Sequence, residues 1–236
     1  MEQGAGSIQS GIFFGKMIVV EALDDEYAYP WAADWYHTKV KENLGSHIDE
    51  RFRLWFAQNS MHGGGTKYSK QDGVRIAGYE GVLQRALRDL AAWVEKGTPP
   101  PSSTSYKVED SQISVAATAA SRRGVQPVVK LTANGGVRTN VKVGEAVSFT
   151  GTVEVPPGGG KVVVAEWDFE GSGDYPVNGQ LQPSDASGGH VSVKTTYTFS
   201  KPGTYFPVLR AASQRKPEGT AYARAVNLDR VRVVVT

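Results

Sequence analysis

Residues 16–57, KMIVVEALDDEYAYPWAADWYHTKVKENLGSHIDERFRLWFA, decide the fold of the first part of this 236-residue chain. The run at 16–21 (KMIVVE) is short and almost wholly apolar, which is typical of a buried parallel strand. A turn-rich segment follows, and apolar residues then recur every four positions, which predicts an amphipathic helix over residues 31–44. Pro30 stands where a helix start tolerates proline, and Gly45 stands where a helix ends.

The same pattern continues after this helix. Residues 51–57 (RFRLWFA) indicate a second strand, 59–66 (NSMHGGGT) a glycine-rich loop, and 81–96 a second helix that Gly97 ends. The apolar residues that share one face of this helix are Leu83, Leu87, Leu90 and Val94. The order of strand, helix, strand and helix predicts a partial parallel βαβα sheet, whose ligands bind beyond the carboxyl ends of the strands. We therefore expect the acidic loop after the first strand and the loop of His62 to be neighbours.

Composition excludes several classes of function. A net charge of +2 with scattered Lys and Arg residues does not favour nucleic acid as a partner. The longest apolar runs are too short to span a bilayer, and the first residues, MEQGAGSIQSG, lack the pattern of a signal peptide. With no cysteine, the chain has neither disulfides nor thiolate metal sites. As written, the chain is expected in the cytoplasm, without a membrane partner.

The segment 97–104 (GTPPPSST) divides the chain into parts of different class. Four of the five tryptophans precede it, whereas runs rich in valine and threonine follow it. We predict an α/β domain at 1–104, a linker or wrapping segment at 105–126, and an all-β domain at 127–236. The strands expected in the all-β domain are 128–133, 146–155, 162–169, 191–199, 204–211 and 226–235.

An acidic loop followed by a histidine loop is the later part of the order Ser, Asp or Glu, His found in hydrolase triads. The matching residues are Asp24 or Asp25, then Tyr29-Pro30-Trp31, and then Met61-His62-Gly63-Gly64-Gly65. With these motifs, residues 16–96 resemble the C-terminal part of α/β hydrolases of the tannase and feruloyl-esterase kind. The resemblance implies hydrolysis of a small carboxylic ester or a lactone, with His62 as general base oriented by Asp24 or Asp25.

The chain departs from this family in one respect. It contains no G-x-S-x-G, and the strand and helix that should hold a serine nucleophile before residue 16 are absent. We therefore expect a truncated hydrolase unit that self-associates through the exposed edge of its partial sheet. The alternative is a non-catalytic fragment that acts in binding or as a spacer through its all-β domain. Without the family resemblance, His62 is a surface loop residue and Asp24 and Asp25 belong to a solvated turn.

The remaining aromatic and histidine residues have structural explanations. Most tryptophans of the first part are expected in the core, because their spacing follows the helix and strand faces: Trp31, Trp35, Trp55 and Trp93. His37 and His47 are expected to be solvated. No H-x-x-x-H or H-x-H spacing occurs, so a histidine metal site is not predicted.

Three phrases in the last part share a second resemblance. They are VGEAVSF at 143–149, WDFEGSGD at 167–174 and YTFSKPGTY at 197–205. Together they resemble the polycystic-kidney-disease (PKD) repeat, which implies an immunoglobulin-like β-sandwich with Trp167 in its core. Such domains accompany extracellular hydrolases as binding modules or spacers, so the resemblance implies an exported parent protein.

The second phrase also carries a candidate metal site. Asp168, Glu170 and Asp174 place three oxygen donors within seven positions, which could hold a calcium ion. The alternative is a solvated acidic turn. No other cofactor is predicted.

Overall fold

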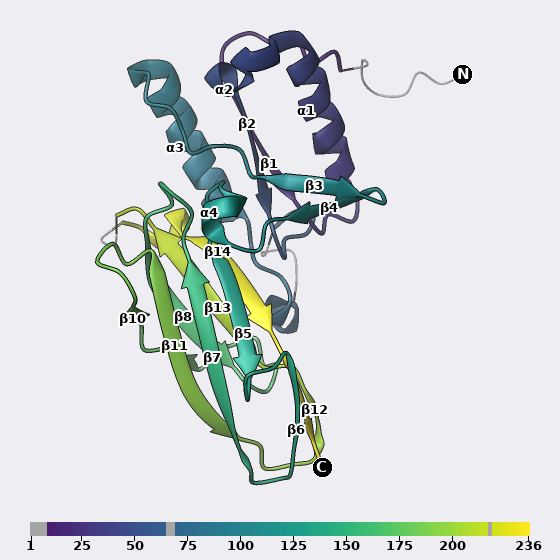
Figure 1. Ribbon diagram of the computed structural model, residues 1–236, viewed down its shortest axis with the longest axis vertical. Helices are drawn as coiled ribbons and strands as arrows, with labels where there is room; N and C mark the ends of the chain where they lie inside the picture. The colour runs from purple at the N-terminus through teal and green to yellow at the C-terminus, as the bar shows by residue number, and fades with distance from the viewer. Residues whose placement is uncertain (1–8, 65–68, 217–218) are drawn as a thin grey trace.

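The computed structural model describes residues 9–64, 69–216 and 219–236 of the chain. The fold is rich in β-strands (Figure 1). The strands from residue 128 onward gather at one end of an elongated molecule, while the two long helices lie at the other end together with the strands before residue 116. Residues 1–8 and the last two residues of the predicted glycine-rich loop, Gly65 and Thr66, lie outside the described residues. Within the described ranges, no helix is long and apolar enough to cross a membrane.

The first part follows the predicted order of strand, helix, strand and helix. Its two long strands pair in parallel, in a register that sets Met17 opposite Phe52 and Ala22 opposite Ala57. The parallel pairing is therefore confirmed. The elements are β1 (Met17–Ala22), α1 (Pro30–Leu44), η1 (Gly45–His47), α2 (Ile48–Arg51), β2 (Phe52–Ala57), η3 (Lys70–Val74) and α3 (Glu80–Lys96).

One helix covers each face of this two-stranded sheet. Val40 of α1 packs with Phe52 and Leu54 of β2, whereas Val82 of α3 packs with Trp55 on the opposite face. Successive side chains of a strand point to opposite faces, so the apolar run of β2 is buried on both. The result is three layers: helix, sheet and helix.

The orientation of α3 differs from the simplest reading of its sequence. The side of α3 that packs on the protein carries Val82, Arg85, Ala86, Asp89 and Trp93. The apolar stripe noted in the sequence points outward instead, with exposed fractions of 42% for Leu83, 56% for Leu87 and 61% for Val94. The reason is tertiary, because two polar side chains on the buried side find partners in the β-rich part.

The segment between the two parts is more ordered than a linker. Its first residues run beside β2, where the amide of Thr104 donates to Leu54 O at 2.8 Å and the amide of Phe56 donates to Thr104 Oγ1 at 3.0 Å. A hairpin then packs Tyr106 and Ile113 into the α1 core. The segment contains β3 (Tyr106–Glu109), β4 (Gln112–Val115) and α4 (Ala119–Arg122).

The last part consists mainly of two four-stranded sheets that share one core. One sheet has the order β10-β11-β7-β5 and the other β14-β13-β8-β9, and a smaller sheet, β12-β15-β6, continues them. The rings of Phe149 and Trp167 come from opposite sheets and lie 6.2 Å apart between centroids. Trp167 is fully buried, as predicted.

Most of the predicted strands are present, with three differences. The run 204–211 is divided at Phe206-Pro207 into β12 and β13, and 226–235 is divided at Val231 into β14 and β15. The short strands β6, β9 and β10 were not predicted. The bounds are β5 (Val128–Ala133), β6 (Arg138–Val141), β7 (Ala146–Glu154), β8 (Lys161–Asp168), β9 (Val177–Asn178), β10 (Gln182–Pro183), β11 (His190–Thr198), β12 (Gly203–Tyr205), β13 (Val208–Gln214), η4 (Ala221–Ala223), β14 (Ala225–Arg230) and β15 (Arg232–Val235).

Buried polar groups join the two parts. Arg85 of α3 donates to Gly159 O at 2.8 Å and to Ser213 O at 2.7 Å. Gln126 receives a hydrogen bond from the amide of Gln58 at 2.7 Å and donates to Gln58 O at 3.0 Å, as a neighbouring strand would. Since buried polar groups are costly to leave without partners, these contacts fix the first part against the β-rich part.

Candidate functional site

The two loops that the sequence singled out lie side by side. β1 and β2 end at the same edge, and the pairing continues past them: Leu23 donates to Ala57 O at 2.8 Å, and Asp24 donates to Ser60 O at 2.9 Å. The carboxyl ends of both parallel strands therefore deliver their loops to one place, which confirms the predicted neighbourhood.

Asp25 and His62 form a direct pair at this edge. Nδ1 of His62 lies 3.1 Å from Asp25 Oδ1 and 3.0 Å from Asp25 Oδ2. The Asp25 side chain is 9% exposed, whereas the His62 side chain is 42% exposed. A carboxylate on Nδ1 fixes the tautomer and the orientation of an imidazole, so that Nε2 is the nitrogen on the far side of the ring.

The turn after β1 holds Asp25 in place. The amides of Tyr27 and Ala28 donate to Asp25 Oδ1 at 2.9 and 2.7 Å. Burial by itself would raise the pKa of Asp25, but the two amides and the bond to His62 outweigh it and hold this pKa below its usual value. The carboxylate is therefore kept ionised beside the imidazole.

The histidine loop is shaped by glycine and by acidic neighbours. Gly63 and Gly64 have φ angles of 82° and 72°, in the left-handed region that glycine adopts readily. The amide of His62 donates to Glu26 Oε2 at 3.1 Å, and the ring of Tyr27 meets the imidazole edge-on with centroids 5.3 Å apart. Glu26 and Tyr27 thus help to position His62, although sequence analysis gave them no role.

Asp24 has a different place. Its amide belongs to the continued ladder, and its carboxyl group faces the amide of Asn59 and the charge of Arg230. Desolvation raises the pKa of Asp24, while Asn59 and Arg230 act in the opposite direction. Of the two aspartates that the sequence left open, the structure brings Asp25 to His62.

Glu21 is a further carboxylate near the pair, and sequence analysis missed it. It is the penultimate residue of β1, and its Oε1 atom is buried without a hydrogen-bond partner among the described residues. Burial, helped by the charge of Asp25, raises the pKa of Glu21 to about 7, although His62 acts against this rise. A glutamate within an apolar strand, next to its carboxyl end, was the available signal.

A cavity of about 630 Å³ opens beside Asp25. Tyr29 and Trp31 form one wall, with stacked rings whose centroids are 6.2 Å apart. The turn of the β3–β4 hairpin, with Ser111 and Ile113, forms another wall. Cavities of this size hold small organic ligands. The aromatic wall corrects one expectation, because Trp31 is 55% exposed and not part of the core.

Of the other tryptophans and histidines, some have the burial that the sequence predicted and others do not. Trp55 and Trp93 are buried as expected, but Trp35 is 42% exposed. His37 is not solvated, because its ring stacks on Phe52 and its Nδ1 lies 3.0 Å from the hydroxyl of Tyr106. His47 is exposed and pairs with Glu50 on the surface.

The three acidic residues of the β-rich part do not converge on one point. Asp168 is 1% exposed, and its carboxylate accepts hydrogen bonds from four successive amides, at residues 170–173. Glu170 accepts a bond from the hydroxyl of Tyr197 at 2.7 Å, and Asp174 pairs with Lys70. Among the residues that the structure describes, no group of three or more His, Asp or Glu side chains could hold a metal ion. The buried carboxylate of Asp168 instead shapes its own turn.

A scan of the sequence against protein-family models and a search among curated proteins both find no match. The site is therefore interpreted from its own geometry. An imidazole held by a buried carboxylate can accept a proton at Nε2 and return it later in a reaction. The cavity beside Asp25 has an aromatic wall that suits an apolar group, and its lining includes Asp24 and Asp25 but not His62.

Proposed function

We propose that the chain hydrolyses small carboxylic esters or lactones, with His62 as general base and Asp25 as the residue that orients it. The observation that carries this proposal is the contact between Nδ1 of His62 and the Asp25 carboxylate, at the shared carboxyl edge of two parallel strands. The cavity next to Asp25 would take an apolar or aromatic substituent of the substrate against the stacked Tyr29 and Trp31, and the ester group would extend from it toward His62, which lies outside the lining.

The chemistry is ordinary acyl transfer. His62 removes a proton from the nucleophile, which attacks the carbonyl carbon, and the imidazolium returns the proton to the departing alcohol oxygen. With no G-x-S-x-G in the sequence, water is the nucleophile that these residues can activate directly. An ester then yields an acid and an alcohol, and a lactone opens to a hydroxy acid.

The test compares two pairs of variants on 4-nitrophenyl acetate and on the aromatic lactone dihydrocoumarin. His62→Ala should lower kcat by about 10²-fold or more, the scale of a positioned general base. Asp25→Asn should also lower kcat, because it weakens the hold on the imidazole. The matched control for His62 is His47→Ala, which should change kcat little. Asp24→Asn, at a residue that also lines the cavity, should lower kcat less than Asp25→Asn, because Asp25 is the carboxylate that holds the imidazole.

His47 is a better control than His37, because His37 packs on Phe52 and its loss would disturb the core. Full activity of His62→Ala on both substrates would disprove the assignment of the base. Equal losses from Asp24→Asn and Asp25→Asn would disprove the assignment of the orienting carboxylate.

The second candidate is a non-catalytic protein that binds or spaces through its β-rich part. It is favoured by the missing nucleophile motif, and it would be the better description if the purified chain hydrolyses neither substrate above the rate in buffer. In support of a PKD-type sandwich, Trp167 is enclosed between two sheets, and Pro202-Gly203 leads into β12. The expectation of an exported parent protein rests on that resemblance and stays a prediction.

We also propose that a second copy of the chain pairs with the outer edge of β1. Among the described residues, β2 is the only strand that pairs with β1, so one row of its amides and carbonyls faces outward. α3 packs over β1 through Val82 and Ala86, and the same helix exposes Leu83, Leu87 and Val94, which we propose extend the interface. Two copies of one edge can pair antiparallel about a two-fold axis, which makes a closed dimer.

Analytical ultracentrifugation at micromolar concentration tests this second proposal. The wild-type chain should sediment as a dimer, and Leu87→Glu should shift it to a monomer. Val108→Glu, a matched change at an exposed apolar residue of β3, should leave the dimer intact. A monomeric wild type, or equal effects of the two variants, would refute it.

A further inference from the structure

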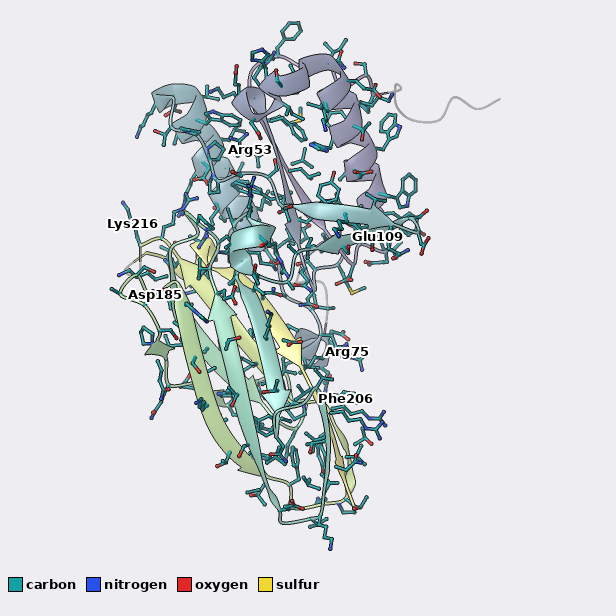
Figure 2. All side chains as sticks on the ribbon, viewed as in Figure 1. Arg53, Arg75, Glu109, Asp185, Phe206 and Lys216 are labelled. Atoms are coloured by element: carbon teal, nitrogen blue, oxygen red, sulfur yellow. The ribbon has the colours of Figure 1, made fainter. Side chains whose placement is uncertain are left out.

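A second cavity lies where the two parts of the chain meet. Its volume is about 740 Å³, and its lining comes from η3 in the first part and from the β8, β12, β14 and β15 regions of the second. Arg75 and Phe206, two of its lining residues, lie close together along one side of the molecule (Figure 2). Ligand sites occur preferentially at such junctions, and the volume suits a small organic molecule.

Three arginines from separate elements surround this cavity. Arg75 follows η3, Arg230 ends β14 and Arg232 begins β15. Arg230 and Arg232 lie on either side of the buried Val231, where β14 gives way to β15, and both line the cavity. Glu170 is the one carboxylate of the lining, and it already accepts a hydrogen bond from Tyr197.

None of the three guanidinium groups has a hydrogen bond or ion pair with a residue that the structure describes, although the charge of Arg230 is felt by the carboxyl groups of Asp24 and Asp229. Arg85 and Arg215, by contrast, are held by carbonyl groups and by Asp89. Like charges that converge on one hollow repel each other, and an anion between them removes that repulsion. The arrangement therefore favours a ligand with more than one negative charge.

An aromatic surface accompanies the charges. Phe206 is 50% exposed at the break between β12 and β13, and Tyr205 beside it also lines the cavity. A guanidinium group pairs with a carboxylate through two parallel hydrogen bonds, and an exposed aromatic ring stacks with the flat face of another ring. The two features together favour a ring that carries more than one anionic group, and carboxylates are one class of group that the guanidinium fork fits.

We propose that this cavity binds a ring-bearing polycarboxylate through Arg75, Arg230, Arg232 and the ring of Phe206. Acidic oligosaccharides and aromatic polycarboxylates share this chemistry. The proposal is independent of ester hydrolysis, because it uses neither His62 nor Asp25.

Isothermal titration calorimetry on the full chain at low salt tests the proposal with three probes. Trigalacturonate represents the sugar acids, benzene-1,3,5-tricarboxylate the aromatic acids, and inorganic phosphate a simple anion. At least one ring-bearing probe should bind, and the one that binds more tightly identifies the source. Failure of both to bind, or equally tight binding of phosphate, would overturn the proposal.

Variants locate the binding. The double variant Arg75→Gln, Arg232→Gln should weaken the ring-bearing probe at least about tenfold, since charge-assisted hydrogen bonds are among the stronger polar contacts. Phe206→Ala should weaken it by about two- to tenfold, the range for an aromatic contact. Arg88→Gln removes an exposed arginine of α3 outside this cavity and should have no effect.

Equal weakening by Arg88→Gln would overturn the proposal, because it would show general attraction to a basic surface. Should the double variant fail to fold, the single variant Arg230→Gln replaces it, with the same expected direction. Binding by the wild type should also weaken about tenfold when salt rises from about 50 to about 500 mM, because the contacts are ionic and partly exposed. Binding that is insensitive to salt would equally overturn the proposal.

Discussion

Replacement of Arg85 by methionine should uncouple the two parts of the chain. The Arg85 side chain is 3% exposed, and its guanidinium group donates to carbonyl oxygens of Val125, Gly159, Ser213 and Ala223. Burial, with the nearby charge of Arg215, lowers the pKa of Arg85 to about 10, and the group remains charged at neutral pH. Methionine fills a similar length but donates nothing.

The size of the effect follows from the two short bonds. Hydrogen bonds from a charged group contribute about 1.5–3 kcal/mol each, so losing those to Gly159 and Ser213 would cost about 3–6 kcal/mol. Removing a buried charge returns part of this, because its desolvation penalty disappears. We expect a net loss of about 2–4 kcal/mol, a large share of the roughly 5–15 kcal/mol that stabilises a typical domain.

Urea unfolding followed by tryptophan fluorescence measures this loss. Trp55 and Trp93 report on the first part and Trp167 on the second, so the variant should unfold in two transitions where the wild type shows one. Arg88→Met, at an exposed position on the same helix, is the control and should stay within about 0.5 kcal/mol of wild type. A single transition with a loss below about 1 kcal/mol would refute the reasoning.

Three further predictions concern single residues. Because folding raises the pKa of Glu21 from 4.5 to about 7, the folded state binds the extra proton, and wild-type stability should fall as pH rises between these values. Glu21→Gln should remove this dependence of stability on pH, and its free energy of unfolding at pH 8, measured in urea, should exceed that of the wild type by about 1–2 kcal/mol after allowance for partial exposure. An unchanged dependence on pH would contradict this prediction. Gly81→Ala would place a Cβ 1.7 Å from Arg224 O, so it should lower the free energy of unfolding by about 1–3 kcal/mol despite the better helix propensity of alanine. The control Gly73→Ala, with open space around it, should not destabilise the protein. Equal melting temperatures of the two variants would contradict this prediction. Asp168→Ala should lower the melting temperature while EDTA leaves the wild type unchanged, because amides and not a metal satisfy this carboxylate; a stabilising effect of calcium would contradict it.

The neighbourhood of the candidate site could be predicted because it depends on local rules. Apolar runs and helical periodicity located β1, α1 and β2, and parallel strands deliver their following loops to one edge. The choice between Asp24 and Asp25 could not be predicted, since it depends on which carboxylate accepts the hydrogen bonds from the amides of Tyr27 and Ala28. That is a matter of turn geometry, which adjacent identical residues do not reveal.

Other features depend on contacts that lie far apart in the sequence. The buried side of α3 contains Arg85 because carbonyl groups more than 40 residues away in the sequence accept its hydrogen bonds. The apolar stripe of α3 therefore predicted the wrong side of the helix as the buried one. The hairpin at 106–115 has few local signals, yet it buries Tyr106 against α1 and forms a wall of the candidate site. Trp31 lines the same cavity as this hairpin, a position that its spacing along the helix did not indicate.

The side-chain amide of Gln126 makes the two hydrogen bonds with the backbone of Gln58 that a neighbouring strand would make. This amide is satisfied only when Gln58 from one part and Val226 from the other are both present. A recombination event that joined the β-rich part to another protein would leave this buried amide, and the carbonyl groups around Arg85, without partners. The two parts should therefore travel through evolution as one unit and not as exchangeable modules.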